Sequence, residues 1–109
     1  MSEIFQDDTL EWQPVRPEIT QGVLGRTLLA EGVKTVLTRV APGGKFKLHR
    51  DNYHHLFYFL SGEGTVQVGD KQVPARPGLT VQVTAGEMHA YENTGTADLV
   101  LLSLNLPRT

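Results

Sequence analysis

The chain has 109 residues, 39% of them hydrophobic and 20% charged, which is the composition of one ordinary globular domain. Its 10 Lys and Arg residues against 12 Asp and Glu give a net charge of -2, which provides no general attraction for DNA, RNA or an acidic membrane. The absence of cysteine excludes disulfides, thiolate catalysis and thiolate metal sites. Any bound metal must therefore be held by nitrogen and oxygen atoms.

No segment is predicted to be a targeting or membrane signal. Residues 1–8 are acidic and lack the basic region and apolar run of a secretory signal. No stretch approaches the roughly 18 apolar residues of a membrane span. We therefore expect a cytoplasmic protein that binds neither a membrane nor a nucleic acid.

Residues 1–21 are predicted to form an arm in front of a folded body that comprises residues 22–109. Pro14 and Pro17 favour extended backbone in this arm. Phe5 and Trp12 are large apolar side chains that need to be buried. We expect the arm to pack on the body of its own chain or on a partner subunit.

The body is predicted to be all-β. Gly and Pro recur every few residues, too often for long helices, and the segments between them are rich in β-branched, aromatic and leucine residues. Nine short strands without helical periodicity indicate a sandwich or a barrel. The predicted strands are 23–29, 33–40, 46–50, 55–60, 65–68, 71–75, 80–83, 88–92 and 99–106.

Two hairpins are predicted within this body. The turn 69–70, Gly-Asp, joins two of the short strands and suits a tight antiparallel connection. The second hairpin carries His49 and Asp51 on one arm and His55 on the other, with 52–53 as its turn. We expect the first hairpin to be structural and the second to carry the chemistry.

All four histidines lie between residues 49 and 89, which favours a common site over scattered surface positions. Residues two apart on a strand share a face, so His49 and Asp51 are predicted to project from one side, roughly 7 Å apart. On the next strand His55 and His54 must point to opposite faces. We expect His55 to point inward and His54 to lie at the surface or an interface.

The segment around these residues resembles the first sequence motif of the cupin family, which runs Gly, five residues, His-x-His, three or four residues, Glu, six residues, Gly. Gly43, His49 and Gly62 match this motif in residue type. Asp51 stands where the second His is usual, and His55 stands where Glu is usual.

The second cupin motif, Gly, five residues, Pro-x-Gly, two residues, His, three residues, Asn, is also matched. Gly78, Gly86, His89 and Asn93 have the expected types, and Thr84 replaces the Pro. Both motifs together cover nearly the whole body at the correct separation. The resemblance implies a double-stranded β-helix, also called a jelly-roll barrel, in a small single-domain cupin.

The resemblance also implies metal ligands at His49, Asp51, His55 and His89. Two of these four differ from the usual type, and one reading is a cupin that lost its metal. The other reading is that an imidazole and a carboxylate exchanged places, so three nitrogens and one carboxylate oxygen remain. We favour the second reading, because random change would seldom restore the same set of ligands.

A bulge in the turn would shift the register by one residue and make His54 the ligand in place of His55. A set of three imidazoles and one carboxylate suits a divalent transition metal: Fe, Mn, Co, Ni, Cu or Zn. The sequence does not distinguish among these metals.

A pocket is expected at the mouth of the barrel, lined by side chains that share a face with the ligands. Phe57, Tyr91 and Lys47 have this parity, whereas Phe59 lies deeper and is expected in the core. Tyr91 is a candidate proton donor. Asp51 is a candidate proton acceptor, because the usual Glu is replaced.

The outward face of the strand that carries His55 is also apolar, with Leu56, Tyr58 and Leu60. In a strand with one face in water, the side chains of that face are normally polar. An apolar outward face should therefore be covered by another part of the protein. The predicted cover is a swapped N-terminal arm or a second subunit, in either case in a homodimer. The alternative is that residues 1–17 cover it within one chain.

Two functions fit this sequence. The first is a metal-dependent enzyme acting on a small organic molecule, with dioxygenase-like chemistry as the first choice and isomerase, lyase or cyclase chemistry as alternatives. The second is a non-catalytic module that binds or senses a metal or a small molecule in the same pocket. Substrate-dependent turnover would distinguish the first from the second.

Overall fold

The structure is a computed structural model, and it describes residues 2–107. The described residues contain one short 3-10 helix and nine strands. The elements are η1 (Asp7–Thr9), β1 (Gln13–Pro14), β2 (Thr20–Leu29), β3 (Lys34–His49), β4 (His54–Ser61), β5 (Gly64–Val68), β6 (Lys71–Ala75), β7 (Thr80–Val83), β8 (His89–Asn93) and β9 (Leu99–Leu106). Between residues 2 and 107 no helix has the length and apolar character needed to cross a membrane.

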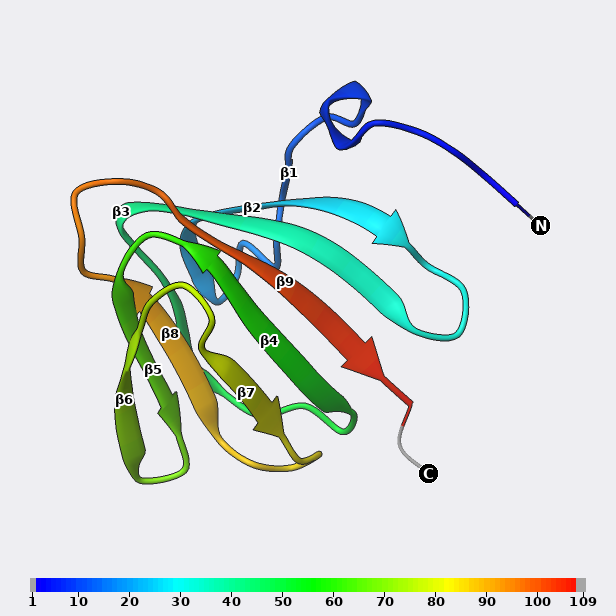
Figure 1. The fold of residues 1–109 in the computed structure, drawn as a ribbon. Coiled ribbons are helices and arrows are strands. Elements are labelled where there is room, and N and C mark those ends of the chain that lie inside the picture. Colours follow the sequence, from blue (N-terminus) through cyan, green and yellow to red (C-terminus); the bar gives the residue numbers. More distant parts are fainter. Residues whose placement is uncertain (1, 108–109) are drawn as a thin grey trace.

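The strands form one curled antiparallel sheet in the order β6-β5-β8-β3-β9-β4-β7, with β2 added to β3 and β1 added to β2. Figure 1 shows β6, β5 and β8 as one wall, and β4, β9 and β2 as the other. The two walls enclose a jelly-roll barrel, so the predicted fold class is confirmed.

Strand β3 belongs to both walls. It runs for 16 residues and joins two segments that the sequence predicted as separate strands, 33–40 and 46–50. Strand β2 pairs with both parts of β3, whereas β9 pairs only with its first part and β8 only with its last part. The bend between them depends on glycine: Gly43 has φ of 78°, and a Cβ on Gly44 would lie 2.7 Å from the carbonyl oxygen of Gln21.

The register of β3 shifts at its end. Phe46 pairs with Tyr91 and His49 pairs with His89. The two pairs are therefore three residues apart on β3 but only two residues apart on β8. Such an irregularity reverses the alternation of side chains. Phe46 and His49 therefore both face the barrel interior, whereas Lys47 is exposed on the outside.

The core fills the closed end of the barrel with aliphatic and aromatic side chains from both walls. Phe59 is completely buried, as predicted from its depth along the strand. The buried apolar residues are Val23, Val40, Phe46, Phe57, Phe59, Val66, Ala75, Val81, Val83, Tyr91, Leu99 and Leu101. This packed layer supports the histidines, which lie at the other end.

One of the two predicted hairpins is confirmed and the other is wrong. Strands β5 and β6 pair up to Val68 and Lys71, with a two-residue turn in which Gly69 has φ of 59°. Strands β3 and β4 do not pair, because β9 lies between them in the sheet. The connection 50–53 instead crosses from one wall to the other, and Asp51 lies in it rather than on a strand.

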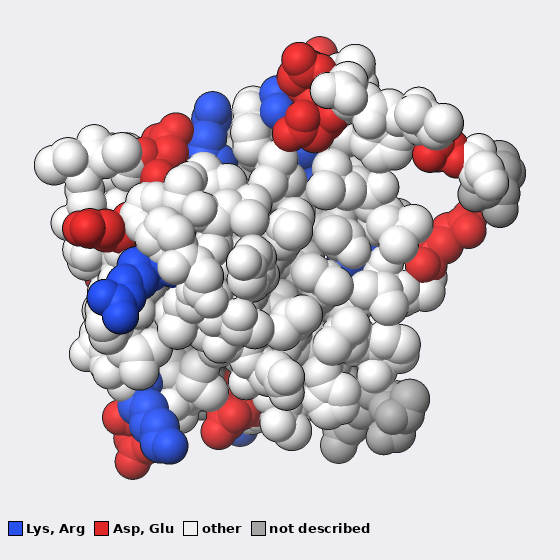
Figure 2. Space-filling view, in the orientation of Figure 1, with Lys and Arg blue, Asp and Glu red and all other residues white. Residues whose placement is uncertain are grey.

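The N-terminal arm lies on the barrel of its own chain. Strand β1 pairs with β2, and the guanidinium groups of Arg26 and Arg39 lie over the indole of Trp12, at 4.2 and 4.5 Å from the ring centroid. Residue 1 of the predicted arm and residues 108–109 of the predicted barrel lie outside the described residues. Figure 2 shows one face of this surface, on which both signs of charge are mixed at the margins.

The Asn of the second motif stabilises the fold. The side chain of Asn93 is buried, and its Nδ2 donates hydrogen bonds to the carbonyl oxygens of Val40 and Ala97, both at 2.8 Å. Its Oδ1 accepts a hydrogen bond from the Gly95 N–H at 2.9 Å. These bonds connect β8, β3 and the turn before β9.

Replacing Asn93 should therefore destabilise the protein without touching the histidines. We expect Asn93→Ala to lower the free energy of unfolding by about 2–4 kcal/mol, because the buried hydrogen bond to the Val40 carbonyl and two partly buried hydrogen bonds, to Ala97 and Gly95, are lost. The measurement is urea unfolding followed by circular dichroism. The neighbouring exposed Thr94→Ala is the matched control, and equal stability of the two variants would contradict this role.

Candidate metal centre

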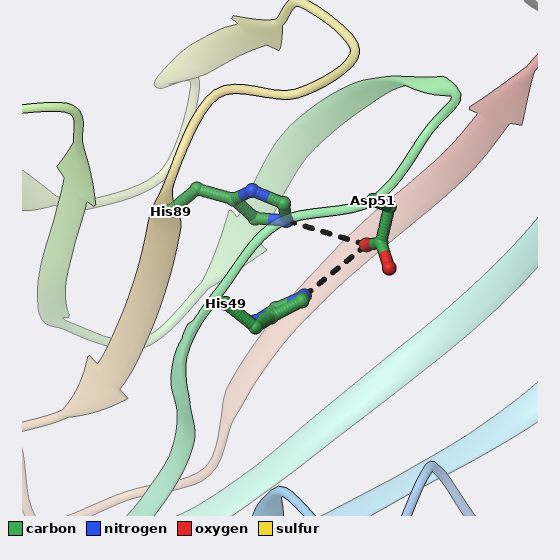
Figure 3. Close-up of side chains that lie close together, drawn as sticks. All are labelled: His49, Asp51 and His89. Carbon is green, nitrogen blue, oxygen red and sulfur yellow. Dashed lines mark ion pairs between the residues drawn. The ribbon is translucent and has the colours of Figure 1, made fainter.

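The four predicted ligands lie together at the open end of the barrel. His49 ends β3, His55 lies in β4, and His89 begins β8. The Nε2 atoms of these three histidines lie 3.2, 2.9 and 3.8 Å from Oδ2 of Asp51, respectively. Figure 3 shows the imidazoles of His49 and His89 pointing toward this carboxylate.

Three of the four offer ligand atoms that lie within 4.8 Å of one another: His49, Asp51 and His89. One ion can contact atoms at this spacing. His55 lies beside this group, and its Nε2 is the nearest of the three imidazole nitrogens to the Asp51 carboxylate. All four side chains are at most 10% exposed.

Main-chain carbonyls orient two of the imidazoles. Nδ1 of His49 lies 2.7 Å from the Lys47 carbonyl oxygen, and Nδ1 of His89 lies 3.0 Å from that of Glu87. A carbonyl oxygen only accepts, so each Nδ1 carries the proton and each Nε2 presents a lone pair to the site. Metal-binding histidines are held in this way.

The donor set fits a divalent transition metal. The Nε2 of His89 is buried and has no hydrogen-bonding partner among the described residues, which is costly for a polar atom. A metal ion beside Asp51 would satisfy this nitrogen. Imidazole nitrogens with a carboxylate oxygen suit Fe, Mn, Co, Ni, Cu or Zn.

Asp51 is held in place by the loop that precedes His89. The Gly86 N–H donates a hydrogen bond to the Asp51 carbonyl oxygen at 2.7 Å. Gly86 has φ of 89°, a conformation that favours glycine. The glycine of the second motif thus joins the Asp51 loop to the strand that carries His89.

A residue that the sequence did not indicate completes the surroundings of Asp51. Nη1 of Arg16, in the N-terminal arm, donates a hydrogen bond to Oδ1 of Asp51 at 2.8 Å. Burial by itself would raise the pKa of Asp51, but the hydrogen bonds from Arg16 and His55 and the charges of Arg16 and His49 outweigh it and lower this pKa. The carboxylate therefore stays ionised.

Burial lowers the pKa of two histidines, because it disfavours the charged form of an imidazole. It lowers the pKa of His89 to about 4, and it also lowers the pKa of His55, although Asp51 partly opposes the second shift. Both imidazoles are neutral at neutral pH. Neutral imidazole is the form that binds metals.

The alternative ligand His54 lies on the outer face of β4. Its Nδ1 accepts a hydrogen bond from the Ala85 N–H at 2.9 Å. Strand β4 pairs regularly with β7 from His55, opposite Val83, onward. The alternative in which a bulge turns His54 inward is therefore wrong.

A cavity of about 230 Å³ adjoins the histidines. Phe57 and Tyr91 line it, and so does Tyr53, which the sequence placed only in a turn. Burial raises the pKa of Tyr91, so its phenol stays protonated. The lining is Gln13, Pro14, Val15, Arg16, Gly25, Thr27, Lys34, Val36, Thr38, Phe46, His49, Tyr53, His55, Phe57, His89, Tyr91, Ser103 and Asn105.

Lys47 is not brought to this cavity. It lies in a groove on the outer surface together with Lys45, Gln67 and Glu92. The parity argument that assigned it to the pocket assumed a regular strand up to His49. The register shift of β3 breaks that assumption, so the expectation for Lys47 is corrected.

Comparison with known proteins shows the family of this barrel. A family model described as a cupin domain matches residues 36–105. The chain belongs to the cupin family. This matches the small single-domain cupin that the two motifs indicated.

A curated protein and a solved structure from Thermotoga maritima both match this cupin. An oxalate-binding protein is 34% identical over 67 residues, which are 61% of this chain and 55% of that protein, so the match spans little more than half of the relative. A solved structure described as a predicted oxalate decarboxylase superposes with a TM-score of 0.89 at 23% identity, covering 97% of this chain and all of that one.

The third comparison is with the polyketide cyclase RemF from Streptomyces resistomycificus. It superposes with a TM-score of 0.87 at 19% identity, covering 96% of this chain and 79% of that one. At this identity the two solved structures establish the shared fold.

The buried neutral histidines predict a pH-dependent stability of the metal-free protein. An unfolded His binds a proton below about pH 6.5, whereas folded His89 does so only near pH 4. The unfolded state therefore binds more protons in this window, and stability falls as the pH decreases. We expect a loss of about 1 kcal/mol between pH 7.5 and 5.5 in chelator-treated protein, measured by urea unfolding.

In His89→Gln this pH dependence should flatten, whereas His54→Gln, outside the cluster, should retain it. Equal pH profiles for wild-type protein and His89→Gln would contradict the assignment.

Proposed function

We propose that this cupin holds a divalent transition metal through His49, Asp51, His55 and His89 and binds a small organic molecule in the adjacent cavity. One observation carries this proposal. The Nε2 of His89 is buried, lacks a partner among the described residues and faces the Asp51 carboxylate. No protein group described here satisfies that nitrogen, and the metal would do so.

The residues around the metal take distinct roles in this proposal. A bound metal supplies a Lewis acid that polarises an oxygen atom of the ligand. Asp51 acts as an ionised ligand and is a weak proton acceptor, because Arg16 and the imidazoles occupy both its oxygens. Tyr91 is the candidate proton donor because its phenol remains protonated, although the same burial makes it a weaker acid and favours a hydrogen bond to the ligand, and Phe57 shapes the apolar side of the cavity.

Two kinds of activity use such a site. The first is catalysis on the bound molecule, for which dioxygenation is the reaction class to test first, ahead of isomerase, lyase and cyclase reactions. The second is binding without turnover, which the name of the oxalate-binding relative favours. The cavity volume suits a molecule of few non-hydrogen atoms, because pockets that receive drug-sized ligands measure roughly 300–1,000 Å³.

Metal content tests the first part of the proposal. Protein purified without chelator or affinity tag and reconstituted with each first-row metal should contain one ion per chain by elemental analysis. Metal affinity should fall in His49→Ala, Asp51→Ala and His89→Ala. Loss of a residue that only contacts a ligand costs roughly 10–100-fold in metal affinity, and loss of a ligand itself should cost more. His55→Ala tests the fourth ligand, and His54→Ala, on the same strand, is the control. Well below one ion per wild-type chain with every metal would refute the proposal.

Oxygen uptake and product analysis with small organic acids separate catalysis from binding. An enzyme shows substrate-dependent turnover that disappears in His49→Ala and His89→Ala while the fold persists. A binding module shows saturable binding by calorimetry and no turnover.

We also propose that this chain forms a homodimer through the outer face of β4 and β9. On this face Leu56 pairs with Leu104, and Tyr58 pairs with Leu102. Tyr58 and Leu60 are 42% and 41% exposed, because the arm lies along β2 rather than over β4. The middle of the face in Figure 2 is mostly uncharged, in the part of the view where β4 and β9 lie.

Sedimentation velocity at micromolar concentration tests the dimer. The wild-type chain should sediment as a dimer, and Tyr58→Lys and Leu60→Lys should shift it to a monomer, because a charge is costly to bury there. Val73→Lys is the matched control, since Val73 is a similarly exposed apolar residue on β6. A monomeric wild-type chain would contradict the proposal.

A further inference from the structure

Arg16 faces the cavity with hydrogen-bonding capacity that the protein does not use. A guanidinium group has five N–H donors. Among the described residues Nη1 donates to Oδ1 of Asp51 at 2.8 Å, and the Tyr53 side chain also lies within reach of the guanidinium, so these two partners leave further N–H donors unused. The side chain is 39% exposed and belongs to the cavity lining, so the remaining donors are accessible to a ligand.

The backbone holds Arg16 in an unusual conformation. Its φ of 42° is the only positive value at a non-glycine position among the described residues. Ile19 N–H and the Thr20 hydroxyl donate hydrogen bonds to the Arg16 carbonyl oxygen, at 3.0 and 3.1 Å. Such a conformation costs on the order of 1–3 kcal/mol and persists only where surrounding contacts impose it, often at functional sites.

The barrel is shaped to receive the arm at this point. Val15 N–H donates a hydrogen bond to the Val23 carbonyl oxygen at 3.1 Å. A Cβ on Gly25 would lie 2.8 Å from the Val15 side chain and 2.7 Å from that of Val36. The absence of a side chain at Gly25 thus lets the arm approach closely and brings Arg16 over the cavity.

The charges of the lining favour an anion. Arg16 and Lys34 are cations, and the lining residues include no Asp or Glu. Two carboxylates lie near Arg16: Asp51, which is already bonded to it, and Glu18, which interacts with its charge but does not line the cavity. A divalent metal in the site would add further positive charge.

We propose that Arg16 binds the carboxylate of a small organic acid in this cavity, while one of its N–H groups keeps Asp51 in place. This inference rests on the proposed function, because it assigns the ligand class of the same cavity. The planar guanidinium matches a carboxylate with two parallel hydrogen bonds. Phosphate, the other common anion, is often bound at a helix N-terminus, and η1 contributes no residue to the lining.

The test is calorimetric titration of metal-loaded and metal-free protein with four probes: oxalate, malonate, the neutral diamide malonamide, and inorganic phosphate. The variants are Arg16→Gln and a matched control, Arg76→Gln, which removes the same charge from an exposed position outside the cavity lining. Metal content is measured on the same samples, so a failure of metal binding is seen separately from a failure of anion binding.

We expect oxalate or malonate to bind the wild-type protein and Arg76→Gln equally well. Metal-loaded Arg16→Gln should bind them about 10- to 100-fold more weakly, the factor that corresponds to one charge-assisted hydrogen bond. Affinity for malonamide should be the same in all three proteins. If Arg16 only positions Asp51, Arg16→Gln would lose metal affinity, but its metal-saturated form would bind the acids as tightly as wild type. That result would overturn the inference.

Two further outcomes would also overturn it: tighter binding of phosphate than of either acid, and no binding of either acid to metal-loaded wild-type protein. If Arg16→Gln does not fold, Arg16→Lys replaces it. This variant keeps the charge but loses the planar pair of donors, so weaker binding of the acids with unchanged binding of malonamide supports the inference, and unchanged binding of both refutes it.

Discussion

The bend of β3 is the constraint on which the site depends. One strand must belong to both walls of the barrel, and Gly43 and Gly44 lie at its bend, on either side of which β3 is paired with β2. The shifted register beyond the bend then turns Phe46 and His49 to the same side. The stacked rings of these residues, with centroids 4.5 Å apart, join the packed core to the imidazole cluster.

The cluster itself is organised around one carboxylate. Asp51 Oδ1 binds Arg16, and Oδ2 faces three imidazoles whose burial keeps at least two of them neutral. A buried carboxylate is stable only when it is paired or hydrogen-bonded. The N-terminal arm supplies that partner, so the arm is part of the site although it is distant from the histidines in sequence.

The strands, the fold class and the clustering of the candidate metal-site residues could be predicted from sequence because they depend on local signals: glycine and proline spacing, β-type side chains and the two motifs. The errors arose where long-range pairing decides the outcome. Local alternation assigned Lys47 to the pocket, but the register against β8 places it outside. The connection between His49 and His55 looked like a hairpin, but β9 separates the two strands.

Arg16 could not be found in this way. It carries no motif, and its contact with Asp51 joins residues 35 positions apart through an arm whose docking depends on Gly25 and Trp12. The only local signal was that Trp12 needed to be buried, and this did not indicate where.

The position of Trp12 has a practical consequence. It is the single tryptophan of the chain, and it contacts two guanidinium groups of the barrel. Its intrinsic fluorescence therefore reports on one event, the seating of the arm, without interference from other indoles. Because Arg16 follows four residues later, the emission spectrum gives an optical signal, without any added label, for whether the cavity has its guanidinium in place.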